Sequence, residues 1–301
     1  MATHFPRQAQ PDPAITPRVV AAGTGATWWA DGWRVLIGSP GTWTLIIVVY
    51  FAIQIILDNV PHIGSFASWL LTPVFAGGLM QGCAARGRGE QLRVSHLFDG
   101  FKANHFVSLL LVGVFNMVAC LLAIIVCVVV VAADIGIGGL TDLTNFVYDP
   151  WRIFSTLGFS FLLVVLMVVL VTGVLAMANW FAPALIVLRD AQPLAAMKTS
   201  LRACMRNWVP FLVYGLIGLG LVIVIGGIFV VAMGVIGYEF IVAIYNGVFA
   251  WKSVGLGLVS LLAVCVALIA VATAVLYGST WASYRDTLSP ASSDVEQPRA
   301  P

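Results

Sequence analysis

The feature that most constrains this chain is a series of six long apolar segments with no charged residue near their centres. A helix of about 20 apolar residues crosses the roughly 30 Å hydrocarbon core of a bilayer. Each segment reaches or approaches that length, and only Asp58 falls inside a segment boundary. We therefore expect six transmembrane helices, at residues 42–60, 63–85, 106–133, 153–188, 208–236 and 254–283.

Composition indicates the same class of protein. Hydrophobic residues make up 60% of the 301-residue chain and charged residues only 9%, with a mean hydropathy of +1.00. A soluble globular protein carries roughly 25% charged residues, which cover its surface with polar groups. The sequence therefore excludes a soluble globular fold, a disordered chain and a collagen. It predicts an all-α polytopic membrane helix bundle.

The cationic residues are distributed unevenly over the predicted topology. Lys and Arg accumulate in the cytoplasmic loops of membrane proteins. Arg152 and Lys252 lie in loops on one side, and the 13 other cations lie on the side of the two termini: Arg7, Arg18, Arg34, Arg86, Arg88, Arg93, Lys102, Arg189, Lys198, Arg202, Arg206, Arg285 and Arg299. This distribution predicts cytoplasmic N- and C-termini in a bacterial inner membrane.

No boundary between folded domains is visible, so we expect one six-helix membrane domain over residues 18–288. Residues 1–17 and the Pro- and Ser-rich residues 289–301 are predicted to be disordered tails. The polar N-terminal region shows no cleavable signal peptide, so the first apolar segment is expected to act as an uncleaved anchor. Outside the membrane we expect a tight turn at 58–62, an interfacial loop at 134–152 and a flat-lying segment at 238–252.

Three stretches on the cytoplasmic side combine an apolar helical face with basic residues: 28–37, 92–103 and 194–206. This pattern is typical of helices that lie in the headgroup region of a membrane. Each stretch is followed by a short break and then by an apolar segment. The sequence therefore predicts three similar units, each an amphipathic interfacial helix followed by a transmembrane hairpin.

Small residues recur at helical spacing within the apolar segments. They form four rows: Gly78 and Gly82; Gly215, Gly226 and Gly237; Ala263 and Ala267; and Ala270, Ala274 and Gly278. Small residues allow helix backbones to approach closely in a membrane. We interpret the rows as packing within this bundle, and a homo-oligomer interface is the second interpretation.

The polar residues at membrane depth are uncharged: Gln54, Asn116, Ser160, Thr172 and Asn179. Asn179 precedes Pro183 by four residues, and a proline leaves a carbonyl about one turn back without its helical partner. The pair Asn179 and Pro183 is interpreted as a helix kink with a neighbouring hydrogen bond. The functional alternative is a gate or a polar binding site. Pro73 is interpreted in the same two ways.

No residues form a recognisable catalytic or metal-binding constellation. Ser95, His96 and Asp99 are neighbours on one surface helix and do not converge on a reacting atom. His96 and His105 are nine residues apart, which is not the spacing of helical metal ligands. We therefore expect no catalytic residue, no bound metal and no cofactor.

Two Arg-Asp pairs end predicted helices on the cytoplasmic side, Arg189–Asp190 and Arg285–Asp286. Arginine suits a helix C-terminus and extends toward the membrane surface, and it also binds phosphate. We favour the structural interpretation and keep phosphate binding as the alternative. The five cysteines are expected to be reduced packing residues: Cys83, Cys120, Cys127, Cys204 and Cys265.

Five segments have a combination of residues that is typical of one family: GWRVLIGSPGTW (32–43), LLTPVFAGGLMQGC (70–83), LFDGFKAN (97–104), WFAPALIVLRD (180–190) and SLRACMRNWVPF (200–211). Together they resemble an uncharacterised bacterial family of six-helix inner-membrane proteins. That family has no assigned activity, so the resemblance implies no catalytic residue. The elements LFDGFKAN (97–104) and SLRACMRNW (200–208) are more distantly similar to the membrane domain of glycerophosphoryl diester phosphodiesterases, which implies lipid-related biology.

Two functions remain for a chain with these features. The first is a non-enzymatic membrane protein that binds or organises lipid or a partner, with anionic headgroups held by the basic interfacial helices. The second is a transporter or permease for an uncharged or amphipathic solute, suggested by repeated units and proline-broken helices. The net charge of +2 gives no indication of nucleic-acid binding.

Overall fold

The structure, a computed structural model, describes residues 16–138, 158–245 and 251–289, and these residues form helices without any strand. Most of the predicted tails, 1–17 and 289–301, and most of the predicted loop at 134–152 lie outside the described residues. The helices are α1 (Thr24–Ile37), α2 (Pro40–Asp58), α3 (Gly64–Gly87), η1 (Val94–Phe101), α4 (Ala103–Gly138), α7 (Gly158–Trp180), α8 (Ala182–Arg189), α9 (Pro193–Arg206), α10 (Trp208–Tyr245) and α11 (Trp251–Leu288).

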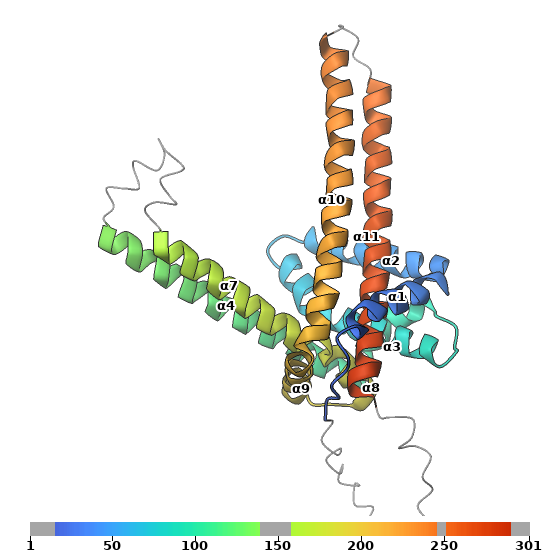
Figure 1. The fold of residues 1–301 in the computed structure, drawn as a ribbon, viewed down its shortest axis with the longest axis vertical. Coiled ribbons are helices and arrows are strands. Elements are labelled where there is room, and N and C mark those ends of the chain that lie inside the picture. Colours follow the sequence, from blue (N-terminus) through green and yellow to red (C-terminus); the bar gives the residue numbers. More distant parts are fainter. Residues whose placement is uncertain (1–15, 139–157, 246–250, 290–301) are drawn as a thin grey trace, which may run out of the picture. The chain divides into compact units, whose positions relative to one another are not determined.

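The described chain divides into two compact units. The first unit comprises the described parts of Met1–Ile53, Gly82–Leu97 and Arg202–Pro301, and the second comprises Gln54–Gln81 and the described parts of Phe98–Leu201. In the first unit, α10 and α11 run side by side and α1 packs on both (Figure 1). In the second unit, α4 and α7 run side by side, and α8 packs on both (Figure 1).

Five helical stretches in the described ranges are long and apolar enough to cross a membrane: Pro40–Asp58, Ala103–Ala133, Phe161–Arg189, Trp208–Val242 and Val259–Leu288. The stretch Phe161–Arg189 includes most of α7 and all of α8. Large apolar side chains along the five stretches are exposed, as at Val128 (60%), Leu170 (64%) and Val230 (68%). Apolar surface of this extent is unstable in water and marks a membrane-facing surface. These helices therefore make the chain an integral membrane protein.

Helix α3 coincides with the second predicted transmembrane segment, but it is not apolar enough to count among those five. Ser65, Ser68, Thr72 and Gln81 lower its hydropathy. Its C-terminal half is nevertheless buried, including Val74, Phe75 and Cys83. A helix covered by protein needs less apolar surface than one that faces lipid. The six-span, three-hairpin arrangement is therefore not confirmed.

Several predicted boundaries are wrong in informative ways. The fourth predicted segment is divided, because α7 ends at Trp180 and α8 begins at Ala182. The predicted flat segment 238–252 is wrong for its first eight residues, because α10 continues to Tyr245. Residues 246–250 lie outside the described residues, and α11 begins at Trp251. Each of these two helices has 38 residues, about 57 Å at 1.5 Å per residue. They are therefore longer than a bilayer core.

The amphipathic stretch at 92–103 is also corrected, because it forms the 3₁₀ helix η1 rather than an α-helix. A 3₁₀ helix repeats every three residues, which places Leu97 and Gly100 on one side, and both are buried. A Cβ atom on Gly100 would collide with the carbonyl oxygen of Val74 on α3. The 3₁₀ helix therefore places Gly100 in contact with α3. Phe98, which the α-helical pattern grouped with the buried residues, is 44% exposed.

Glycines set the contact between α1 and the two long helices of the first unit. Gly32 on α1 lies against Gly278 on α11, where an added Cβ would stand 2.9 Å from the Cα of Gly32. Gly25 lies against the backbone of Pro210 on α10. The row Ala270, Ala274 and Gly278 on α11 therefore packs within the chain, as the first interpretation of these rows expected. By contrast, Gly215, Gly226 and Gly237 have no described atom within 4 Å of an added Cβ.

We predict that Gly32→Ala loosens α1 from α11 and lowers the free energy of unfolding by about 1–3 kcal/mol. A Cβ at this position would collide with the carbonyl oxygen of Val275, which is backbone and cannot rotate away. Thermal unfolding in detergent measures the effect. Gly41→Ala is the control, because nothing lies within 4 Å of its added Cβ. Equal unfolding temperatures for the two variants would contradict the close packing.

Candidate functional site

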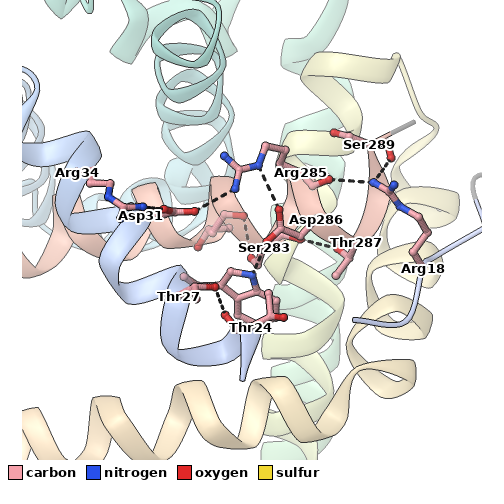
Figure 2. A network of polar contacts seen from close by, with 12 residues as sticks. Arg18, Thr24, Thr27, Asp31, Arg34, Ser283, Arg285, Asp286, Thr287 and Ser289 are labelled. Carbon is pink, nitrogen blue, oxygen red and sulfur yellow. Dashed lines mark hydrogen bonds and ion pairs between the residues drawn. The ribbon is translucent and has the colours of Figure 1, made fainter. Parts of the chain in front are cut away.

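A cluster of charged and polar side chains joins α1 to the C-terminal end of α11 in the first unit (Figure 2). The Arg285 guanidinium forms ion pairs with Asp31 at 3.0 Å and with Asp286 at 3.1 Å. Arg34 forms an ion pair with Asp31 at 2.7 Å, and the indole nitrogen of Trp28 donates to Asp286 at 3.0 Å. Both carboxylates form ion pairs with Arg285, so its charge is already neutralised within the protein. This favours the structural interpretation of Arg285 over phosphate binding.

The segment before α1 closes the same end of α11. The Arg18 guanidinium donates to the carbonyl oxygens of Arg285 at 3.3 Å and Ser289 at 2.5 Å (Figure 2). The backbone N–H of Arg18 donates to the carbonyl of Thr287 at 2.9 Å. The last carbonyls of a helix have no partner inside the helix. Arg18 therefore satisfies the end of α11 and neutralises the negative end of its dipole.

Asn207 is the single residue between α9 and α10, at the corner formed by Arg206, Asn207 and Trp208. Its side-chain oxygen accepts from the N–H of Val20 at 2.9 Å. Its amide nitrogen donates to the carbonyls of Arg18 at 2.9 Å and Ala203 at 3.0 Å. The residue is 1% exposed. Because a buried amide with several partners holds one geometry, Asn207 joins the last turn of α9 and the start of α10 to the segment before α1.

Helix α9 has one buried face and one basic face. Ala196, Met197, Ser200, Ala203 and Cys204 are buried. Its three cations, Lys198, Arg202 and Arg206, are all exposed. The helix contains no Asp or Glu, and none of the ion pairs found among the described residues includes these three cations. The exposed face of α9 is therefore a positive surface that no carboxylate of the described residues neutralises through an ion pair.

Three cations in or beside the other helices are ion-paired. Arg34 on α1 pairs with Asp31, Arg88 after α3 pairs with Glu90 at 2.7 Å, and Lys102 after η1 pairs with Asp99 at 2.9 Å. The hydrogen bond from Arg88 lowers the pKa of the Glu90 carboxyl, so that this pair stays charged. Of the three basic stretches, only 194–206 has all its cations outside the ion pairs found among the described residues, and this makes α9 the strongest candidate for an external anionic partner.

Two of the polar residues predicted at membrane depth contact each other in the second unit. The Asn116 amide nitrogen on α4 donates to the Asn179 side-chain oxygen on α7 at 3.0 Å, and Asn179 returns the bond at 2.9 Å. Asn179 also donates to the carbonyl of Leu175 at 2.7 Å. Reciprocal amide bonds of this kind hold helices together in a membrane. The pair therefore joins α4 to α7.

The break between α7 and α8 involves a side chain that the sequence did not single out. The hydroxyl of Ser200 on α9 accepts from the N–H of Phe181 at 2.9 Å and donates to the carbonyl of Met177 at 2.6 Å. In an unbroken helix those two backbone groups would bond to each other. Ser200 therefore replaces one helical hydrogen bond, which is a recognised cause of a kink, and Pro183 follows within α8.

The histidine and cysteine candidates do not converge. The Nδ1 atom of His96 accepts from the N–H of Arg93 at 3.0 Å, so that it closes its own turn. His105 lies on α4 with its Nδ1 atom 3.5 Å from Asp190. The described residues contain no group of three or more His, Cys, Asp or Glu side chains suited to a metal ion. The five cysteines are free thiols.

The exposed apolar helices define a multi-pass membrane protein, and the comparison with known proteins agrees. The chain is 27% identical over 289 residues to a probable inner membrane protein of Burkholderia thailandensis, which covers 94% of this chain and 95% of that protein. No family model matches the chain. No solved structure matches it. The similarity supports the resemblance to an uncharacterised inner-membrane family, but the expected similarity to glycerophosphoryl diester phosphodiesterases is not shown.

We predict that Asn116 and Asn179 are energetically coupled. In a double-mutant cycle of Asn116→Ala, Asn179→Ala and the double variant, the coupling should be about 0.5–2 kcal/mol, because each single variant leaves one amide without its partner in an apolar setting. Unfolding in mixed micelles measures it. The pair Asn116 and Thr172 serves as the control cycle and should show no coupling. Additive effects at Asn116 and Asn179 would contradict the reciprocal bond.

Proposed function

We propose that this inner-membrane protein is a non-enzymatic, six-helix protein that binds anionic phospholipid at the cytoplasmic leaflet through α9. The observation that carries the proposal is the exposed row of Lys198, Arg202 and Arg206, which takes part in no ion pair with the described residues, on a helix without acidic residues. Each Lys or Arg near an anionic surface contributes about 1 kcal/mol of attraction. A cation already paired inside the protein contributes less.

The position of α9 also suits headgroup binding. Arg206 ends α9, and Trp208 begins α10, which becomes apolar at once. Arginine and tryptophan both favour the boundary between water and hydrocarbon. Leu194 and Met205 are exposed on α9 beside its cations, at 53% and 63%. The helix therefore offers charge to headgroups and apolar side chains to the outer part of the acyl layer.

The proposed topology places all three basic stretches on one side. This requires α3 to cross the membrane, because each crossing reverses the side of the chain. Without that crossing, Arg86, Arg88 and Lys102 would lie opposite the N-terminal cations and the charge asymmetry would be lost. The charge distribution thus supports three hairpins with cytoplasmic termini.

We predict that Lys198→Gln, Arg202→Gln and Arg206→Gln together weaken the binding of phosphatidylglycerol to the full chain in neutral nanodiscs, measured by titrating that lipid against the fraction bound in native mass spectrometry. Each lost cation should lower the affinity about fivefold, the ratio that corresponds to about 1 kcal/mol. The matched control is Arg34→Gln, Arg88→Gln and Lys102→Gln, which removes the same charge from exposed but ion-paired positions. Equal losses in the two triple variants would overturn the role of α9.

A labelling experiment tests the topology in the full chain. In a background without native cysteines, single cysteines replace the exposed residues Asn59, Ser95 and Ala195. An impermeant thiol reagent applied to intact spheroplasts should modify only the cysteine at position 59. Labelling at 95 together with 59 would show that α3 does not cross, and labelling at 195 would overturn the cytoplasmic position of α9.

A further inference from the structure

We propose that the corner between α9 and α10 is a binding site for a phospholipid that carries two phosphates, of the diphosphatidylglycerol type, with Arg202 and Arg206 each holding one phosphate. This inference rests on the proposed function, because it names the lipid that α9 binds. Both arginines and the start of α10 belong to the first unit.

The two guanidinium groups are spaced for paired phosphates. Arg202 and Arg206 are four residues apart on one continuous helix, so that they lie on the same face about one turn apart. Both are exposed, and neither belongs to an ion pair among the described residues. Guanidinium binds phosphate oxygens in a two-pronged geometry, which lysine cannot reproduce. Lys198 extends the same row by one more turn.

An apolar strip begins beside these arginines and follows the helix into the membrane. Trp208, Leu212, Leu216 and Leu219 repeat at intervals of three and four residues on α10 and are 63%, 50%, 58% and 55% exposed. Gly215 lies within the strip, and no described atom lies within 4 Å of where its Cβ would stand. The strip therefore gives acyl chains an open, shallow surface directly below the headgroup contacts.

The corner is held in place before any lipid binds. Asn207 lies between Arg206 and Trp208 and makes its hydrogen bonds with Arg18, Val20 and Ala203. This geometry fixes the last turn of α9, with Arg206, relative to the start of the apolar strip on α10. A preformed site avoids the entropy of ordering its own backbone on binding.

A lipid with two linked phosphates gains more from this site than two separate lipids. Once one phosphate is bound, the second is held close to its arginine, and the second contact becomes intramolecular. A lipid with one phosphate makes the two contacts independently. The preference should therefore depend on the linkage between the phosphates and not on total charge.

The test uses the full-length protein in nanodiscs of neutral lipid with one of two additions. One contains diphosphatidylglycerol, and the other contains twice the molar amount of phosphatidylglycerol, which matches both the negative charge and the number of acyl chains. Native mass spectrometry counts the lipids that remain bound. We expect the two-phosphate lipid to be retained at least about tenfold more than the matched lipid. Arg202→Gln with Arg206→Gln should abolish the difference.

The matched control is Arg34→Gln with Arg88→Gln, which removes equal charge at ion-paired positions and should keep the preference. Thermal unfolding in neutral nanodiscs checks that the variants remain folded. Equal retention of both anionic lipids, with sensitivity to the α9 substitutions, would overturn this inference and leave the proposed function standing. Retention of neither would overturn both. A preference that survives loss of both arginines would place the site elsewhere and would also overturn the inference.

Discussion

The exclusion of charge from hydrocarbon is the constraint on which the rest of the structure depends. No Asp, Glu, Lys or Arg lies near the centre of any apolar segment, so the charged groups gather at the helix ends. There they either neutralise one another, as Arg285 does with Asp31 and Asp286, or stay exposed, as on α9. The difference between those two outcomes separates the cations that stabilise the fold from those available to an external anion.

Helix positions were readable from the sequence because the apolar runs are long and uninterrupted. The sequence placed helices over most of α2, α3, α4, α10 and α11, and it identified Asn116, Asn179 and Pro183 as the notable polar and helix-breaking residues of the interior. A single segment in hydrocarbon satisfies its backbone hydrogen bonds internally by forming a helix. The position and length of each apolar run were therefore sufficient to predict these elements.

The sequence could not predict the details that depend on contacts between segments far apart in the chain. Nothing local distinguishes Ser200 from an ordinary residue of an amphipathic helix, yet its hydroxyl occupies the α7–α8 break. The 3₁₀ form of η1 depends on how closely Gly100 approaches α3, and the role of Asn207 depends on the segment before α1. The sequence also could not predict which cations form ion pairs, because partners such as Asp31 and Arg285 are 254 residues apart.

Ser200 and Lys198 lie two residues apart on α9, one facing the break in α7 and the other facing outward. The Ser200 hydroxyl takes the place of a backbone partner in the last turn of α7, so the bend before α8 depends on a residue of a third helix and not on Pro183 alone. A substitution in α9 can therefore change the course of α7 without touching either helix that meets at the bend.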